Sequence, residues 1–269
     1  MAHNFPRLIR RTVIAVCLCT LLSSCASQST TTSETTRATP GVPINDLIKQ
    51  ADERYAARED TAKVREGQTL LREARAAAPD NYDAAWRMAR ISYVLGDNDS
   101  LGKDEREAAF REGQTAGEAA AAIMPAKPEG HFWLGANLGG YAQLKGPLSG
   151  IAAAKRLRQE METVLKIDDS YQGGSAYMAL GQLDTELPSM LGGDSERAVT
   201  TLEKGLRVGD QNSLLRLALA RAYLATNRKD DARKQLNFIL QMKPSPDYLL
   251  EYKEVNAQAR QLLATRFSK

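Results

Sequence analysis

Histidine and cysteine are scarce in this chain of 269 residues, which holds only two histidines and three cysteines. Aromatic residues are also few, at 6%. These shortages exclude a histidine-rich metal site and a disulfide-stabilised scaffold. A mean hydropathy of −0.41 excludes a polytopic membrane protein. HExxH and CxxC patterns are absent as well.

The first 25 residues have the pattern of an export signal. Three arginines precede an almost wholly apolar run over residues 13–22, which is too short to span a bilayer. The run ends in Leu22-Ser23-Ser24-Cys25, which resembles the lipobox of bacterial lipoproteins. We therefore expect residues 1–24 to be removed and Cys25 to be acylated. The alternative is a plain secretory signal with a chance cysteine.

Removal of the leader changes what the rest of the chain implies. Cys25 would be the only cysteine left, so the exported chain would form no internal disulfide. Ala26 and Ser27 lack the aspartate that retains enterobacterial lipoproteins at the inner membrane. We therefore expect a lipid-anchored protein of the bacterial envelope that faces the periplasm. The outer membrane is favoured over the inner membrane as the site of the anchor.

The mature chain is formally neutral, because the leader contains three arginines and no acid, which leaves 33 basic and 33 acidic side chains. A balanced surface offers no electrostatic footprint for nucleic acid, so no nucleic-acid partner is expected. The one dense basic cluster, residues 155–158, is interpreted as a solvated helix face. Residues 25–43 form a Ser/Thr-rich tether that cannot bury enough apolar surface to order itself, and a folded domain is expected over residues 44–269.

Helical spacing dominates that domain. Ala232, Leu236, Ile239 and Leu240 fall on one stripe of an amphipathic helix, and residues 214–221 repeat the spacing upstream. Asn227 between them is expected to cap the second helix. Further upstream, a stripe of small residues recurs at four-residue intervals and predicts a close approach of two helices: Ala109, Gly113, Gly117 and Ala120.

Internal repetition predicts the fold. The last hairpin resembles a tetratricopeptide repeat in the spacing of its large, small and proline positions: Leu219, Ala220, Tyr223, Ala232, Leu236, Ile239 and Pro244. The helix-ending signal recurs upstream at steps of 46, 43, 42 and 34 residues: Pro79, Pro125, Asp168, Asp210 and Pro244. We expect an all-α, right-handed solenoid of about five helical hairpins. The extra residues are expected to form longer loops at 97–103, 146–150 and 188–193.

The middle of the chain resembles a narrower family, the T component associated with TRAP transporters. The likeness rests on residues 131–139, 168–171, 173–181, 188 and 193–198. Members of that family are lipid-anchored periplasmic helical proteins, and the resemblance implies a role beside a solute-binding protein and, for some members, trimers. The chain has Met178-Ala179 where that family is expected to carry an arginine.

Catalysis is not expected. His131 would be the only histidine of the mature chain, Gly135 to Gly140 lacks the spacing of a dinucleotide fingerprint, and the paired acids belong to helix ends and charged faces. No cofactor and no metal are predicted.

A solenoid of helix pairs exposes a face lined by the first helix of each pair, where a segment or ligand binds. The candidate binding residues on it combine aromatic bulk with polar ends: Trp86, Arg90, Tyr93, His131, Trp133, Asn137, Tyr141 and Tyr177. Core packing is the competing interpretation for the large aromatics. Arg90 would be the natural partner of a carboxylate, and its replacement by alanine would then abolish binding with little change in melting temperature.

Two functions remain open. One is a periplasmic accessory of TRAP-type solute uptake, working with a solute-binding protein and a small-molecule ligand. The other is a protein-interaction scaffold in envelope assembly. Both are lipid-anchored, and both allow a homo-oligomer.

Overall fold

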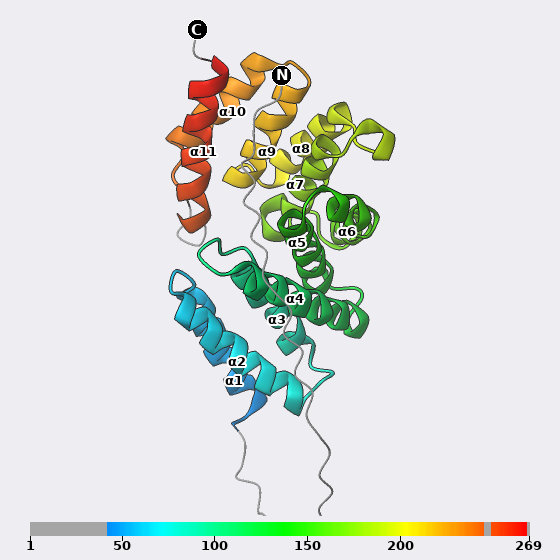
Figure 1. Cartoon of the computed structure of the whole chain (residues 1–269), viewed down its shortest axis with the longest axis vertical. Helices are drawn as coiled ribbons and strands as arrows, with labels where there is room; N and C mark the ends of the chain where they lie inside the picture. Colours follow the sequence, from blue (N-terminus) through cyan, green and yellow to red (C-terminus); the bar gives the residue numbers. More distant parts are fainter. Residues whose placement is uncertain (1–41, 245–248, 268–269) are drawn as a thin grey trace, which may run out of the picture. The chain divides into compact units, whose positions relative to one another are not determined.

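The structure, a computed structural model, describes residues 42–244 and 249–267, and within them the chain is built from helices joined by short turns (Figure 1). The predicted leader over residues 1–24, Cys25 and the tether up to residue 41 lie outside the described residues. The described helices are α1 (Ile44–Ala56), α2 (Thr61–Ala77), α3 (Tyr82–Gly96), α4 (Lys103–Ile123), α5 (Pro128–Lys145), α6 (Pro147–Ile167), α7 (Tyr171–Glu186), η1 (Ser189–Leu191), α8 (Ser195–Val208), α9 (Ser213–Ala225), α10 (Lys229–Gln241) and α11 (Leu249–Phe267).

The helices pack as consecutive hairpins. Each odd-numbered helix from α1 to α9 packs against the even-numbered helix that follows it, and α11 packs on α9 and α10. The expected all-α fold of about five hairpins is confirmed, and the predicted repeat junctions fall at the ends of α2, α4, α6, α8 and α10. None of the helices in the described part of the chain is long and apolar enough to cross a membrane.

The first helices of the hairpins, called A helices here, form one face. Each A helix contacts the next one, from α1 through α3, α5, α7 and α9 to α11. The second helices lie further apart, since α2 and α4 are separated by a groove of about 380 Å³ that Arg65 and Arg72 bridge to Glu105 and Glu112.

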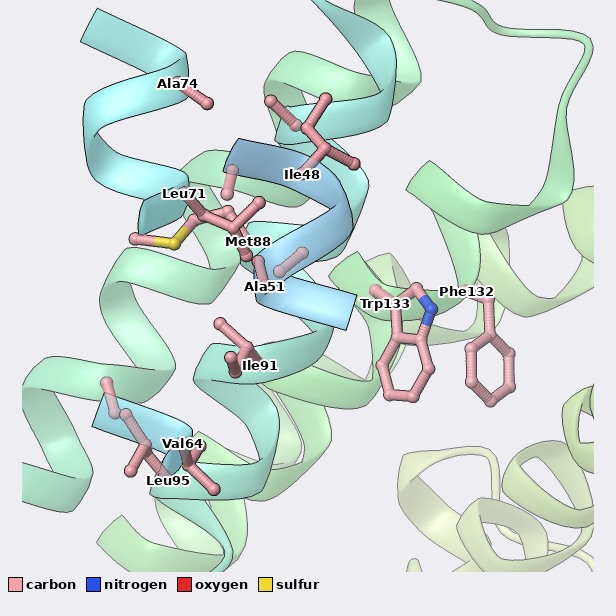
Figure 2. Packing of buried hydrophobic residues seen from close by; sticks show 14 of the residues in the cluster. Ile48, Ala51, Val64, Leu71, Ala74, Met88, Ile91, Leu95, Phe132 and Trp133 are labelled. Atoms are coloured by element: carbon pink, nitrogen blue, oxygen red, sulfur yellow. The ribbon is translucent and has the colours of Figure 1, made fainter. Parts of the chain in front are cut away.

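Apolar burial holds the array together. Figure 2 shows Ile48 and Ala51 of α1 near Leu71 of α2 and Met88 of α3. A second cluster occupies the last hairpins, where Ala232, Leu236 and Ile239 of the predicted stripe are all fully buried. Each fully buried leucine or isoleucine contributes roughly 1.5–3 kcal/mol, so these stripes supply most of the attraction between hairpins.

The stripe of small residues permits the close approach that its spacing predicts. A Cβ atom on Gly117 of α4 would lie 2.8 Å from the Cα of Leu134 on α5. A Cβ on Gly113 would lie 2.1 Å from Oδ1 of Asn137. The α4 and α5 helices thus touch at distances that only glycine allows.

Two local expectations were wrong. Residues 146–150 do not form a loop: Gly146, with φ of 102°, makes the whole connection, and Pro147 begins α6. Proline fits the first position of a helix, so it starts the helix and does not break it. Asn227 does not cap α10, since it adopts a left-handed conformation with φ of 60° and Arg228 holds the N-cap position without a side-chain hydrogen bond to the helix backbone.

The expected insert over residues 188–193 is a loop, and a buried carboxylate anchors it. Asp184 of α7, 1% exposed, receives hydrogen bonds from Arg158 of α6 and, at 2.6 and 2.7 Å, from Arg197 of α8. Arg197 also donates to the carbonyl of Gly192 at 2.6 Å. Arg158 is therefore a structural residue, whereas Lys155 and Arg156 of the same basic cluster are exposed as expected.

The C-terminal helix reaches back to the first hairpin. Glu251 of α11 pairs with Arg58 in the turn between α1 and α2 at 3.4 Å, and Lys253 lies 3.8 Å from Glu59. Residues almost two hundred positions apart thus meet at the same side of the array.

Candidate functional site

Aromatic side chains run along the A helices of several hairpins; Phe132 and Trp133 are buried in the core, whereas Tyr55, Trp86, Tyr93 and Tyr171 are half-buried. Tyr93 of α3 packs on Trp133 of α5 with ring centroids 5.9 Å apart, and Phe132 packs edge-on against Tyr171 of α7 at 5.3 Å. The rings of Phe132 and Trp133 are themselves 5.1 Å apart, and Figure 2 shows both side chains together. We call the whole set the aromatic row: Tyr55, Trp86, Tyr93, Phe132, Trp133 and Tyr171.

Arg90 joins α1 to α3 at one end of the row. Its guanidinium lies 3.7 Å from the ring centre of Tyr55 and 4.9 Å from that of Trp86. It also donates to Oδ1 of Asp52 at 2.5 Å, and Arg87 donates to the same carboxylate at 2.9 Å. Arg90 therefore has a carboxylate partner inside the protein, and its side chain is only 15% exposed.

Two donors beneath the row are incompletely satisfied. Nε of Arg90 and Nε1 of Trp133 are buried and find no acceptor of ordinary hydrogen-bond geometry among the described residues. The hydroxyl of Tyr171 interacts with both side chains. Burial raises the pKa of this hydroxyl to about 12, although Trp133 and Arg90 each act to lower it. Buried donors of this kind usually have a partner, and the hydroxyl of Tyr171 is the acceptor within reach of Nε1 of Trp133.

The turn that presents Tyr171 has an unusual backbone. Gln172, Gly173 and Gly174 all have positive φ, with values of 52°, 59° and 74°. Asn212, which caps α9, donates from Nδ2 to the carbonyl of Gly173 at 2.9 Å and so holds the turn. A cavity of about 210 Å³ lies beside it, with Gln172, residues 208–214 and Glu251 around it.

Two of the predicted binding residues belong to the core between hairpins. Asn137 is fully buried, and its Nδ2 donates to the carbonyls of Ala89 and Trp133 at 2.9 and 2.7 Å. His131 lies between Glu160, 2.7 Å from Nδ1, and the carbonyl of Pro125, 3.1 Å from Nε2. The structure therefore does not place either side chain on the aromatic row.

Two further candidates lie elsewhere. The hydroxyl of Tyr141 meets Arg111 of α4 at 2.6 Å, and Tyr177 donates to Asp169 at 3.2 Å while its ring side packs near Gly205 of α8. Of the eight predicted residues, the structure brings together Trp86, Arg90, Tyr93 and Trp133.

Sequence reasoning missed Tyr55 and Tyr171 as members of the row, and Asp52 as the partner of Arg90. Tyr171 belongs to a quoted motif and begins an A helix, so its place in the repeat was the available signal. Asp52 lies about one turn before the end of α1, and no local pattern pairs it with a residue 38 positions away.

Metal binding finds no support in the part of the chain that is described, where no group of three or more histidine, cysteine, aspartate or glutamate side chains could hold an ion.

Comparisons with known proteins identify the repeat class. The family described as Regulator of microtubule dynamics protein 1-3 matches residues 47–190, more than half of the chain. The chain belongs to this family. A tetratricopeptide repeat family matches residues 190–250, so the family domain is followed directly by a repeat of the type expected from the last hairpin. No curated protein matches the chain.

Solved structures agree on the fold. A thermophilic tetratricopeptide repeat protein of Thermus thermophilus, TTC0263, is 18% identical, with a TM-score of 0.60 over 82% of this chain and 100% of that one. The pilF protein of Pseudomonas aeruginosa is 16% identical, with a TM-score of 0.55 over 84% of this chain and 93% of that one. The chain is thus a helical-repeat protein of the tetratricopeptide type, and none of the families matched is the T component.

Arg90→Ala should destabilise the protein, contrary to the expectation from the sequence. Because Arg90 ties α1 to α3 through Asp52 and two rings, we expect the free energy of unfolding to fall by about 1–3 kcal/mol, or several degrees in thermal melting. Arg111→Ala is the matched control, since Arg111 also pairs with an acid and covers a tyrosine ring but is 62% exposed. Equal shifts in the two variants would contradict the structural role of Arg90.

Proposed function

We propose that this protein is a protein-interaction scaffold that holds a segment of a partner protein against its A-helix face. The observation that carries the proposal is the aromatic row, which crosses the A helices of four hairpins and keeps the rings of Tyr55, Trp86, Tyr93 and Tyr171 partly exposed. Such rings supply apolar contact for the side chains of a bound segment.

The cellular setting is part of the proposal. The sequence predicts an export signal and an acylated Cys25, so we propose a lipid-anchored protein that faces the periplasm and a partner from the bacterial envelope. The family description refers to regulators of microtubule dynamics, and the predicted export signal is the reason for proposing an envelope partner here.

The alternative, an accessory of TRAP-type solute uptake, has less support. One of the matching families and the similar solved structures are tetratricopeptide repeat proteins, and Arg90, the residue expected to bind a solute carboxylate, is engaged by Asp52. Recovery of a small organic ligand in the experiment that tests the scaffold would favour this alternative.

That experiment is site-specific photo-crosslinking in the native envelope. The full chain would carry p-benzoylphenylalanine at Trp86, on the aromatic row, or at Tyr141, between α4 and α5 and away from it. We expect a defined partner protein to crosslink at position 86 at least five times more strongly than at position 141, with the crosslinks mapping to one segment of that partner. Equal crosslinking at both positions would overturn the proposal, as would recovery of a bound organic acid with no protein.

A further inference from the structure

The most exposed large apolar side chains lie in the first turns of α6 and in the loop that follows α7. Met190 on η1 is 97% exposed, Leu148 in the first turn of α6 is 84% exposed, and Leu191 and Ile151 are 46% and 39% exposed. We call these four residues the apolar tip. They lie apart from the aromatic row and from both cavities, so the proposed scaffold function does not account for them.

The turn between α6 and α7 has only three residues, so the chain reverses there, and the ion pair between Arg158 and Asp184 ties the two helices together. Leu148 and Ile151 precede Arg158 on α6, and Met190 follows Asp184 beyond the end of α7, so both groups are expected toward the same end of this helix pair.

The loop that carries Met190 is held rigidly. The amide of Asp194 donates to the carbonyl of Asp184 at 2.8 Å, the amide of Leu191 donates to Pro188 at 2.8 Å, and Arg197 holds the carbonyl of Gly192. A Cβ on Gly193 would lie 1.8 Å from the carbonyl oxygen of Leu187, so the loop packs directly on the end of α7. These contacts therefore hold Met190 in its exposed position.

One face of α6 changes in polarity along its length. Leu148, Ile151 and Lys155 follow one another at helical spacing, and Glu162 comes two turns later on the same face. Lys155 is exposed and makes no ion pair among the described residues. At a rise of 1.5 Å per residue, Lys155 lies about 10 Å behind Leu148. Along this face of α6, apolar side chains at the N-terminal end are thus followed by a basic one and then by an acidic one.

We infer that the apolar tip inserts into the interface of a lipid bilayer, with Lys155 at the level of the lipid phosphates. Apolar side chains enter the interface to a depth of about 5–10 Å, and the long stem of a lysine lets its charge stay at the headgroups, so a lysine about 10 Å behind the tip would stand at headgroup level. The predicted acyl anchor supplies the bilayer: the chain from Cys25 to Val42 spans at most about 60 Å when fully extended, so the domain stays close to the membrane. The insertion orients the anchored domain in addition to the tether.

The test uses the mature full-length lipoprotein, in which acylated Cys25 leaves no free thiol once the leader is removed. Met190→Cys and Leu148→Cys would each carry an environment-sensitive fluorophore, and Asp230→Cys on α10, where the side chain is 88% exposed, is the control. Intact-mass analysis verifies the acylation. The protein is reconstituted in vesicles of phosphatidylethanolamine and phosphatidylglycerol that contain a lipid with a quencher near its headgroup.

We expect a blue shift of emission at positions 148 and 190 and at least threefold stronger quenching there than at position 230. Lys155→Glu should reduce the quenching at position 190 by at least half, because the reversed charge is repelled by the anionic lipid. Equal quenching at all three positions would overturn the inference. A blue shift without quenching that grows with protein concentration would overturn it too, and would assign the tip to contact with a second copy of the chain.

Discussion

Replacing Asp184 by alanine should lower the free energy of unfolding of the helical domain by about 3 kcal/mol, because it leaves two guanidinium groups without their shared buried partner. Arg158 and Arg197 are 27% and 46% exposed and can turn toward water, which keeps the loss below that of a fully buried network. The effect should extend to the loop over residues 188–193, which Arg197 ties down. Chemical denaturation measures the loss, and hydrogen exchange at Gly192 and Gly193 measures the release of the loop.

Asp231→Ala is the matched control for this experiment. Asp231 on α10 also lies between two cations, Arg228 and Lys234, but on the surface, and its loss should leave the denaturation midpoint almost unchanged. Comparable losses in the two variants would show that burial of Asp184 does not matter.

The stability that Asp184 contributes through Arg158 and Arg197 also depends on pH. Burial alone would raise the pKa of the Asp184 carboxyl, but the hydrogen bonds from Arg197 and Arg158 outweigh it and hold the pKa below its usual value. The stabilisation is therefore complete above the pKa of about 4 in the unfolded chain, and it is lost as the pH falls through the folded value. Asp184→Asn should make acid unfolding less steep in this range.

Gly117→Ala should destabilise the protein by about 1–3 kcal/mol. Alanine is intrinsically better in a helix than glycine by up to about 1 kcal/mol, but the new Cβ would lie 2.8 Å from the Cα and 2.9 Å from the backbone nitrogen of Leu134, and a backbone cannot turn aside. The clash forces α4 and α5 apart and disturbs the packing above and below the contact. Thermal melting followed by circular dichroism measures the result.

Gly150→Ala separates the gain in helix propensity from the cost of the clash. Gly150 lies in α6, and a Cβ there would meet nothing within 4 Å, so only the helix-forming gain remains and the variant should be equally stable or slightly more stable. Opposite signs for the two glycines are expected, and a loss of stability in both would contradict the packing argument.

Features that depend on local spacing were predictable from the sequence. The stripe of Ala232, Leu236 and Ile239 is buried as its spacing predicts, and the small residues of α4 meet α5 as their four-residue interval indicates. Both patterns follow from the geometry of a single helix, so no knowledge of distant residues was needed.

Features that depend on distant partners were not predictable. The polar amide of Asn137 predicts a binding residue, yet the carbonyl of Ala89, 48 residues earlier, holds it in the core. The guanidinium of Arg90 predicts a ligand contact, and Asp52 already engages it. The buried carboxylate of Asp184 gave no signal, because its two arginines come from helices on either side of α7. The roles of Asn227 and Pro147 were not predictable either, because asparagine and proline each suit more than one position at a helix end.

The contact between α11 and the first turn has a consequence for cooperativity. In an open array of repeats each unit touches only its neighbours, so an end can fray without a penalty elsewhere. Here the pairs Arg58–Glu251 and Glu59–Lys253 join the beginning of the array to its end. Surface ion pairs contribute about 0–1 kcal/mol each, so local melting of the first hairpin should loosen the last helix only slightly. The two ends of the helical domain are therefore weakly coupled, and fraying at one end carries a small penalty at the other.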